Sequence, residues 1–189
     1  MPEASLFVIS GPAGAGKGTL VSRVLERVPN SWLSISATTR APRGQEVDGV
    51  DYRFLTTEEF ERTIEEDGFV EWALVHSNYY GTPVAPIREH LSKGGVVLLE
   101  IDVQGGFQVR EKFPDAHLVF IAPPSMEVLE RRLRGRGTDS EESIRRRMSD
   151  AAGEMEASKR YDVVIVNDEL EKATDELVEV IESQSVYLP

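Results

Sequence analysis

Cysteine is absent from the 189-residue chain. A disulfide framework, a thiolate nucleophile and a cysteine-ligated zinc or iron–sulfur centre are therefore excluded. Long apolar runs are also missing, since none approaches the ~18–20 residues that span a bilayer. The stretch from Met1 to Ser5 has neither the basic nor the apolar region of a signal peptide. We therefore expect a cytoplasmic protein with no membrane partner.

Basic residues are scarce relative to acidic ones. The sequence has 21 Lys and Arg against 33 Asp and Glu, which gives a formal net charge of −12. This balance disfavours a nucleic-acid partner, because such binding neutralises many phosphates with basic side chains. The length fits one compact domain with small insertions, since domains typically run ~50–250 residues. Small phosphate ligands are not excluded, because their binding depends on where the cations lie.

Continuous runs of Val, Ile and Leu are typical of strands that are buried on both faces. They are Ser5 to Ser10, Val96 to Ile101, His117 to Ala122 and Asp162 to Val166. Segments with helical spacing of apolar residues follow them, and these are Thr19 to Val28, Gln104 to Phe113, Ser125 to Arg134, Ser140 to Lys159 and Glu169 to Ser183. This alternation predicts an α/β fold in which helices flank a parallel sheet.

One long region, residues 34–90, interrupts the alternation. It is rich in Tyr, Thr and Arg and contains shorter strand-like pieces, Tyr52 to Leu55 and Phe69 to Val75. Thr56 and Glu59 have the spacing of a capping box at the start of a helix. The region reads as a subdomain inserted into the core.

A second interruption runs from Arg131 to Arg147, where seven arginines surround a glycine-containing stretch. Its composition suggests a mobile basic flap over the site. We therefore divide the single domain into three parts: a core of residues 1–33, 91–125 and 148–189, the inserted subdomain of residues 34–90, and a lid of residues 126–147.

The segment between the first apolar run and the first helix reads GPAGAGKGT. This is the context of a P-loop, in which glycines let backbone N–H groups surround a phosphate and the helix N-terminus adds positive charge. Lys17 would reach the terminal phosphates. Gly18 stands where the usual pattern has Ser or Thr, which leaves Thr19 as the candidate Mg²⁺ ligand. The predicted phosphate-binding residues are Gly11, Pro12, Ala13, Gly14, Ala15, Gly16, Lys17, Gly18 and Thr19.

The inserted subdomain holds a second set of polar residues. Arg40 and Arg43 lie in a proline-containing loop near several tyrosines. Guanidinium forks and phenol hydroxyls suit a phosphate dianion, although two arginines taken alone are more often a solvated surface pair. Glu71 lies between Val70 and Trp72 in an apolar run, where alternation alone would place it on the outer face of a strand. The residues by themselves leave both alternatives open.

Ten sequence blocks occur in the order found in guanylate kinases and span essentially the whole chain. They read GPAGAGKGT, SATTRAPR, DYRF, FVEWA, NYYGT, LEIDVQG, IAPPS, RGRGT, EESIRRRM and VIVND. The chain thus resembles the guanylate kinases, a family of P-loop nucleoside monophosphate kinases. The resemblance implies the P-loop kinase fold and Mg²⁺-dependent phosphorylation of GMP, and also of dGMP, by ATP in purine nucleotide metabolism.

The resemblance also implies roles for individual residues. Ser36 and Glu71 correspond to the residues that hold guanine, and two arginines with two tyrosines correspond to those that hold the GMP phosphate. The full set implied for GMP is Ser36, Arg40, Arg43, Tyr52, Glu71, Tyr80, Gly81, Thr82, Glu100 and Asp102. Guanine offers N1–H and N2–H₂ as adjacent donors, whereas adenine has an acceptor at N1. A carboxylate at Glu71 would therefore select guanine.

The lid and the last strand contribute the remaining implied residues. Arg136 would act in the lid and also meet the adenine of ATP together with Asn167 and Asp168. Asp102 would lie near GMP and Mg²⁺. The set implied for catalysis is Lys17, Arg40, Asp102, Arg132, Arg136 and Arg147.

Two other functions stay open at this point. A different nucleoside monophosphate kinase would share the P-loop but not the guanine-reading Glu71. Guanylate-kinase-like domains of scaffold proteins bind peptides through the former GMP site, and they typically have an eroded phosphate loop. This chain keeps Lys17, the loop glycines and the lid arginines, which favours an enzyme.

Overall fold

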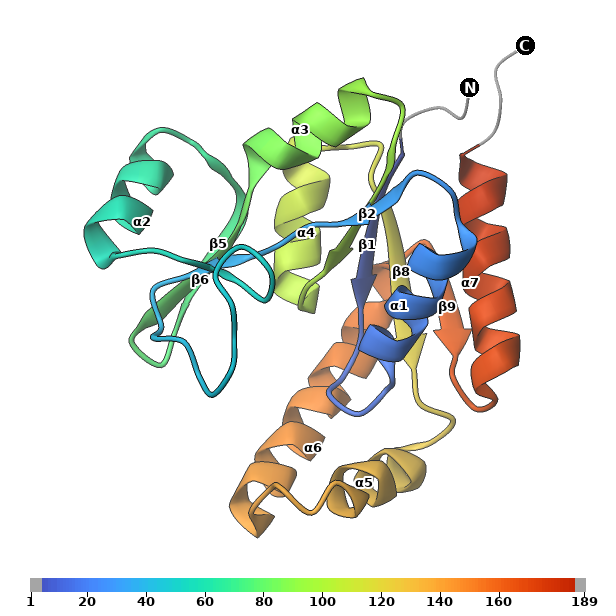
Figure 1. Cartoon of the computed structure of the whole chain (residues 1–189). Coiled ribbons are helices and arrows are strands. Elements are labelled where there is room, and N and C mark those ends of the chain that lie inside the picture. Colours follow the sequence, from blue (N-terminus) through green and yellow to red (C-terminus); the bar gives the residue numbers. More distant parts are fainter. Residues whose placement is uncertain (1–4, 186–189) are drawn as a thin grey trace.

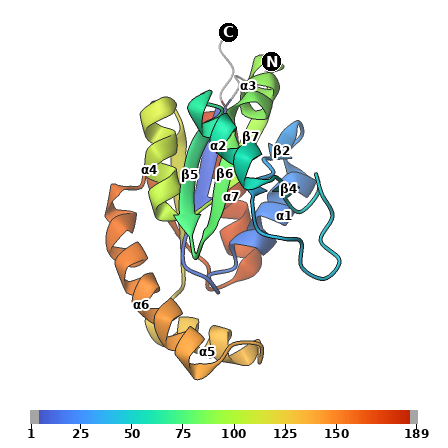
Figure 2. The same ribbon diagram turned by 90° about the vertical axis from the view of Figure 1, so that its left-hand side faces the viewer.

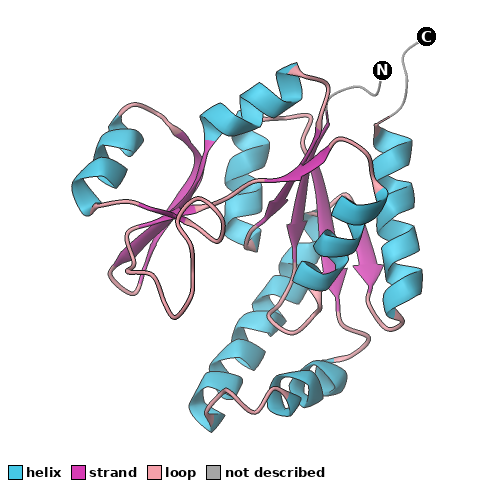
Figure 3. Ribbon diagram, in the orientation of Figure 1, coloured by secondary structure: helices cyan, strands magenta, loops and turns pink. Residues whose placement is uncertain are grey.

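A parallel sheet runs through the centre of the protein (Figures 1 and 3). The structure is a computed structural model that describes residues 5–185. The five strands lie in the order β2-β7-β1-β8-β9, and every neighbouring pair is parallel. They are β1 (Ser5–Ser10), β2 (Ser31–Leu33), β7 (Val96–Glu100), β8 (His117–Ala122) and β9 (Val163–Val166). Residues 1–4, and with them most of the amino-terminal stretch considered above, lie outside the described residues.

Helices cover both faces of this sheet. Side chains alternate along β1, so that Phe7 and Ile9 pack with α1 and α7, while Leu6 and Val8 pack with α3 and α4. The bounds are α1 (Lys17–Arg27), α3 (Val84–Ser92), α4 (Val103–Lys112) and α7 (Leu170–Gln184). Burial on both faces explains the continuous apolar runs, and the predicted α/β fold is confirmed. No helix within residues 5–185 is both long and apolar enough to cross a membrane.

A smaller, mostly antiparallel sheet stands beside the core in Figure 1 and in front of it in Figure 2. Its order is β4-β3-β6-β5, with β3 (Ala37–Thr38), β4 (Arg53–Phe54), β5 (Phe69–Val75) and β6 (Asn78–Pro83). Helix α2 (Thr57–Glu65) covers it and buries Phe60 against Phe69. The helix begins at the predicted capping box, in which the Thr56 hydroxyl accepts from the Glu59 N–H and the Glu59 carboxylate accepts from the Thr56 N–H.

Helix α4 joins the inserted subdomain to the core. The Gln108 side-chain amide accepts from the Trp72 N–H (3.2 Å) and donates to the Trp72 carbonyl (3.4 Å). The Lys112 ammonium donates to the Phe69 carbonyl (2.6 Å) and pairs with Asp67. These contacts hold strand β5 alongside α4 through the backbone of β5. They therefore fix the position of the β5 side chains relative to the core.

Two elements that pack in the core were not anticipated from the sequence, and neither were strands β3 and β6 of the smaller sheet. Strand β2 forms an edge of the parallel sheet, although its three residues are only half-buried. Helix α3 falls within the range expected for the inserted subdomain, yet Val84 and Ile87 pack in the same cluster as the parallel strands. The polypeptide thus returns to the core as soon as β6 ends.

The predicted basic flap is a helical hairpin, seen below the sheet in Figure 1. It consists of α5 (Met126–Gly135) and α6 (Glu141–Ala157), and the short helix η1 (Ser158–Arg160) leads back to β9. Ser125 and Ser140 cap the two helices, each accepting a backbone N–H three residues on (3.1 and 3.2 Å). Leu129, Leu133 and Ala151 form a small core between the helices. The arginines occupy the remaining surface of this hairpin.

The Phe60→Ala substitution tests the core of the inserted subdomain. Phe60 has no exposed surface and stacks on Phe69 and Tyr79, with ring centroids 4.2 and 5.0 Å away. Removing its ring from this small cluster should lower the free energy of unfolding by about 3–5 kcal/mol. Urea denaturation measures the change. The control Val50→Ala, at a side chain that is 68% exposed, should change stability by less than about 0.5 kcal/mol, and equal effects of the two substitutions would contradict this packing.

Candidate active site

The carboxyl ends of the parallel strands bring the predicted phosphate loop and the loops after β7 and β9 to one edge of the sheet. The loop between β1 and α1 turns sharply at Gly11 (φ 149°) and Gly16 (φ 90°), a region of backbone space that favours glycine. A Cβ atom at Gly11 would lie 2.2 Å from the Ile121 carbonyl oxygen of β8. The loop can therefore pack against the sheet only with glycine at this position.

A cavity of about 350 Å³, here called the phosphate-loop cavity, opens in front of this turn. It is lined by Ala13, Gly14, Gly16, Lys17, Gly18, Thr19, Glu100 and Arg136. The Lys17 ammonium donates to the carbonyl oxygens of Gly11 and Pro12, the latter at 3.2 Å. Burial lowers the pKa of Lys17, while Glu100 and Glu154 raise it. The cavity therefore offers a cation and a glycine-rich backbone turn to one ligand.

Asn167 braces the phosphate loop from behind. Its side-chain amide donates to the Ala15 backbone carbonyl (2.8 Å), and the backbone carbonyl of Asn167 accepts from the Arg132 guanidinium (2.9 Å). A Cβ atom at Gly16 would approach the Asn167 amide nitrogen to 2.4 Å. Asn167 is buried, whereas Asp168, the next residue, is exposed. Of the two residues expected beside adenine, one is thus engaged with the phosphate loop.

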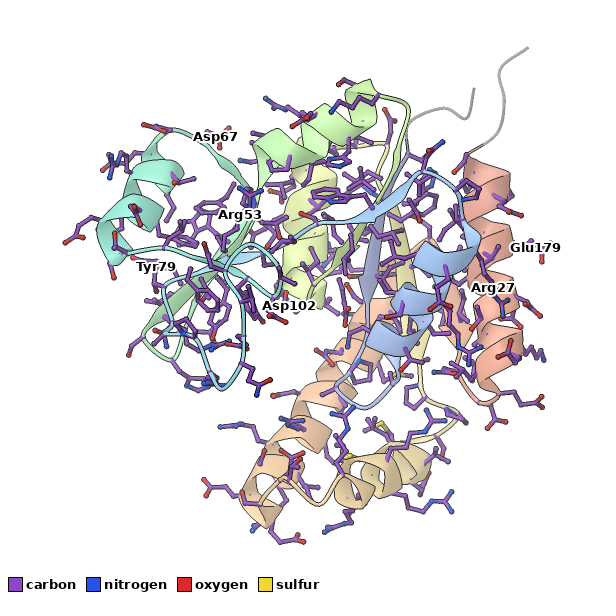
Figure 4. The ribbon with its side chains drawn as sticks, in the orientation of Figure 1. Arg27, Arg53, Asp67, Tyr79, Asp102 and Glu179 are labelled. Carbon is purple, nitrogen blue, oxygen red and sulfur yellow. The ribbon has the colours of Figure 1, made fainter. Side chains whose placement is uncertain are left out.

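A second cavity of about 260 Å³, here called the acceptor cavity, lies between the two sheets. It is lined by Ser36, Tyr52, Glu71, Ala73, Val75, Tyr80, Gly81, Glu100, Ile101 and Asp102. Glu100 lines both cavities, so the two adjoin at this side chain. Figure 4 shows Asp102 at the junction between the inserted subdomain and the core. The structure brings together most of the residues predicted for the acceptor.

Glu71 points into the acceptor cavity rather than outward from its strand. Its Oε1 accepts a hydrogen bond from the Thr82 hydroxyl (2.5 Å), and a Cβ atom at Gly105 on α4 would lie 3.0 Å from its Oε2. Burial raises the pKa of Glu71 to about 7, and the nearby Asp102 adds to the rise while Thr82 opposes it. The carboxylate is thus placed against the start of α4, with one oxygen accepting from Thr82.

The predicted phosphate arginines lie at the rim of the inserted subdomain. Arg40 is buried, and its guanidinium carbon lies 5.2 Å from the centre of the Tyr52 ring. The Tyr80 hydroxyl lies close enough to Arg40 to raise its pKa, after the larger effect of Glu46. Arg43 is exposed on the same loop. Arg40 and the two tyrosines therefore converge, with Arg43 beside them.

The three lid arginines lie in different surroundings. Arg136 lines the phosphate-loop cavity. Arg147 on α6 pairs with Asp139 (3.3 Å), and Arg132 on α5 donates to the Asn167 carbonyl. Only Arg136 of the three reaches the cavity in this arrangement of the described residues.

Comparisons with known proteins identify the family to which the chain belongs. A family model described as guanylate kinase matches residues 3–184. The chain belongs to the guanylate kinase family. It is 52% identical to a guanylate kinase of Synechocystis, over 95% of this chain and 94% of that one. A guanylate kinase of Fusobacterium nucleatum is also 52% identical, over 97% and 98% of the two chains.

Solved structures agree with the family. The crystal structure of guanylate kinase from Anaplasma phagocytophilum superimposes with a TM-score of 0.78 and 33% identity, covering 99% of this chain and 89% of that one. The match includes the parallel sheet with its flanking helices. The predicted P-loop kinase fold and membership of the guanylate kinase family are therefore confirmed.

Three carboxylates of this guanylate kinase family member were missed from the sequence. Glu46 binds Arg40, and Asp139 binds Arg147. Glu154 on α6 is half-buried near Lys17, and burial raises its pKa. Acidic residues a few positions from arginines were the available signal for the first two. Glu154 is far from Lys17 in sequence and had no such signal.

The raised pKa of Glu71 predicts a pH dependence of stability. A carboxyl that titrates near 7 in the folded protein and near 4.5 when unfolded binds more protons in the folded state between these values. Its contribution to stability is therefore complete below pH 4.5 and is lost as the pH rises to about 7. Relative to Glu71→Gln, the wild type should lose free energy of unfolding across this interval and run parallel above it.

Urea titrations of both proteins at several pH values measure this difference. Groups far from Glu71 titrate equally in the two chains and cancel. Parallel profiles across the whole range would show that Glu71 is not held in a desolvated site.

Proposed function

We propose that this chain transfers the γ-phosphoryl group of ATP to GMP, and also to dGMP, with Mg²⁺, giving ADP and GDP or dGDP. The single observation that carries the proposal is the acceptor cavity, where a half-buried glutamate faces the space between the two sheets. Membership of the guanylate kinase family supports the same reaction. We place the protein in the cytoplasm, as an enzyme of purine nucleotide metabolism whose partners are these nucleotides.

Guanine recognition rests on Glu71. The N1–H and N2–H₂ groups of guanine form a pair of donors that an ionised carboxylate accepts in a fork, while Ser36 lines the same cavity. Adenine would present an acceptor at N1 and leave the half-buried carboxylate without the two donors of the base, which is costly in a desolvated site. Thr82 keeps the carboxylate in place through its hydroxyl, a role that serine could also fill.

The acceptor phosphate would bind at the edge of the same cavity. Arg40 and Arg43 supply the positive charge, and Tyr52 and Tyr80 donate hydroxyls without adding charge. Gly81 lets the chain of β6 pass close to the strand behind it, because a Cβ atom there would lie 2.9 Å from the Trp72 Cβ. In this arrangement guanine would lie deep in the cavity, and its phosphate would face the phosphate-loop cavity.

Phosphoryl transfer depends on positioning and charge rather than on a nucleophilic side chain. Lys17 and the backbone of the phosphate loop would hold the ATP phosphates, and Arg136 would neutralise charge that develops between the two nucleotides. Arg132 and Arg147 belong to the same hairpin and would join them when it closes over the site. Closure would also exclude water, which could otherwise accept the phosphoryl group.

The oxygen donors around the phosphate-loop cavity fit Mg²⁺. The Thr19 hydroxyl and the Glu100 carboxylate line this cavity, and Asp102 lies beside Glu100 in the acceptor cavity. Mg²⁺ favours such oxygens and commonly uses one or two protein carboxylates together with phosphates and water. Across residues 5–185 no three acidic, His or Cys side chains gather as a dedicated metal site. When bound, the ion would offset the charge of the β- and γ-phosphates.

A panel of acceptors tests the reaction. With MgATP, the wild type should phosphorylate GMP and dGMP, and the value of kcat/KM for AMP, CMP and UMP should be lower by about 10⁴ or more. A coupled assay of ADP formation measures each rate. Glu71→Gln should lower kcat/KM for GMP by roughly 10- to 150-fold for each charged hydrogen bond lost, and the exposed control Glu58→Gln should not.

Turnover of AMP above GMP would identify a different nucleoside monophosphate kinase. Calorimetry with ATP separates the enzyme from a peptide-binding module. A wild-type protein that neither binds ATP nor forms ADP would overturn the proposal.

A further inference from the structure

Glu46 holds Arg40 by one edge of its guanidinium. The two carboxylate oxygens accept from Nη1 (2.9 Å) and Nη2 (3.0 Å), which is the end-on fork of the two terminal nitrogens. Arg40 is 8% exposed, and the Glu46 side chain is 25% exposed. The pair is therefore largely shielded from water, and a bidentate ion pair in such a setting fixes direction as well as charge.

The remaining donors of Arg40 point to one side. Nη1 also donates to the Ala41 carbonyl (2.8 Å), so three of the five N–H groups are occupied by Glu46 and Ala41. The other two belong to Nε and Nη2 and are parallel, because the guanidinium is planar. The Tyr80 hydroxyl, which is expected to meet the same phosphate, also lies close to this guanidinium. Such a parallel pair matches two oxygens of a phosphate. Glu46 and a phosphate can thus bind different edges of Arg40 at the same time.

Glu46 also shapes the loop that carries Arg43. Its Oε2 accepts from the Arg43 N–H (2.8 Å), and its own N–H donates to the Arg43 carbonyl (3.0 Å). These two bonds close the turn from Arg43 to Glu46 at both ends. One carboxylate therefore constrains the side chain of Arg40 and the backbone from which the Arg43 side chain projects.

We propose that Glu46 is a positioning residue for acceptor recognition, which turns the Nε and Nη2 edge of Arg40 and the side chain of Arg43 toward the phosphate of the nucleoside monophosphate. This inference rests on the proposed function, in which Arg40 and Arg43 bind that phosphate. The opposite arrangement, in which Glu46 competes with the phosphate for Arg40, predicts tighter acceptor binding when Glu46 is removed. The use of separate guanidinium edges favours positioning.

Steady-state kinetics of the full chain test the proposal. Glu46→Gln removes the charge and one acceptor of the fork, and it should raise KM for GMP roughly 10- to 150-fold, the range for one lost charged hydrogen bond. The value of kcat should change less, and KM for ATP should stay as in the wild type. Glu46→Asp keeps the charge but withdraws the carboxylate by one methylene, and it should also raise KM for GMP.

Asp51→Asn is the matched control. Asp51 lies in the same loop and accepts from the Val47 N–H (2.7 Å), so the substitution removes the same charge without touching either arginine. It should leave KM for GMP near the wild-type value. If both substitutions shift KM equally, Glu46 acts only through its charge and the proposal is wrong.

Binding of guanosine, which lacks the phosphate, separates positioning from general damage. Glu46→Gln should bind guanosine as the wild type does and bind GMP more weakly, as measured by calorimetry. Equal weakening of both ligands, or a KM for GMP in Glu46→Gln and Glu46→Asp that is unchanged or lower, would overturn the inference. A wild-type protein that does not phosphorylate GMP would instead overturn the proposed function.

Discussion

Repulsion between like charges is the constraint on which this site depends. A protein that joins two phosphorylated nucleotides must hold several cations close together, each facing a defined direction. Within residues 5–185, four of these cations have a protein oxygen at the charged end, whereas Arg136 lines the phosphate-loop cavity and Arg43 is exposed. The pairs are Lys17 with the Gly11 and Pro12 carbonyls, Arg40 with Glu46, Arg132 with the Asn167 carbonyl, and Arg147 with Asp139.

These partners differ in what they do to the charge. Carbonyl oxygens orient Lys17 and Arg132 while leaving them their full positive charge, which a phosphate can then use. Carboxylates at Glu46 and Asp139 neutralise as well as orient. The net charge of −12 is compatible with a phosphate site, because part of the acidic excess holds the arginines of that site in place.

The proposed base site contains a negative charge instead of cations, because the half-buried Glu71 carboxylate lies where the guanine donors would bind. The cost of burial appears as the raised pKa of Glu71, and the fold supplies the restraint. Strand β5 is tied to α4 through Gln108 and Lys112, and Gly105 leaves room for the carboxylate beside the helix. Specificity for guanine therefore depends on how the inserted subdomain packs on the core, as well as on the residues that touch the base.

The sequence predicted those parts of the protein that depend on local patterns. The runs at Ser5 to Ser10 and His117 to Ala122 are strands with the predicted bounds. The phosphate loop could be predicted because its residues are contiguous in the sequence. Strand β2 was missed because three half-buried residues carry no periodic signal. The helices expected at Ser125 to Arg134 and Ser140 to Lys159 are present as α5 and α6. Their charge hid the small apolar core that packs them into a hairpin, so the region from Arg131 to Arg147 read as a mobile flap.

The site residues also divide into those that the sequence predicted and those whose contacts depend on tertiary structure. Ser36, Glu71 and Asp102 were predicted from the family resemblance, and they line one cavity. Two hydrogen bonds depend on how the loops close in three dimensions. Asn167 donates to the Ala15 carbonyl, and Glu46 accepts from one edge of the Arg40 guanidinium. No spacing rule in the sequence specifies which edge of the Arg40 guanidinium Glu46 binds.

A crystal structure of the protein with GMP tests the central claim most directly. The account predicts that the Glu71 carboxylate accepts from N1–H and N2–H₂ of guanine. It also predicts that Nε and Nη2 of Arg40 lie about 2.7–2.9 Å from phosphate oxygens while Glu46 keeps its end-on fork. Guanine bound away from Glu71, or Arg40 released from Glu46 to meet the phosphate, would contradict it.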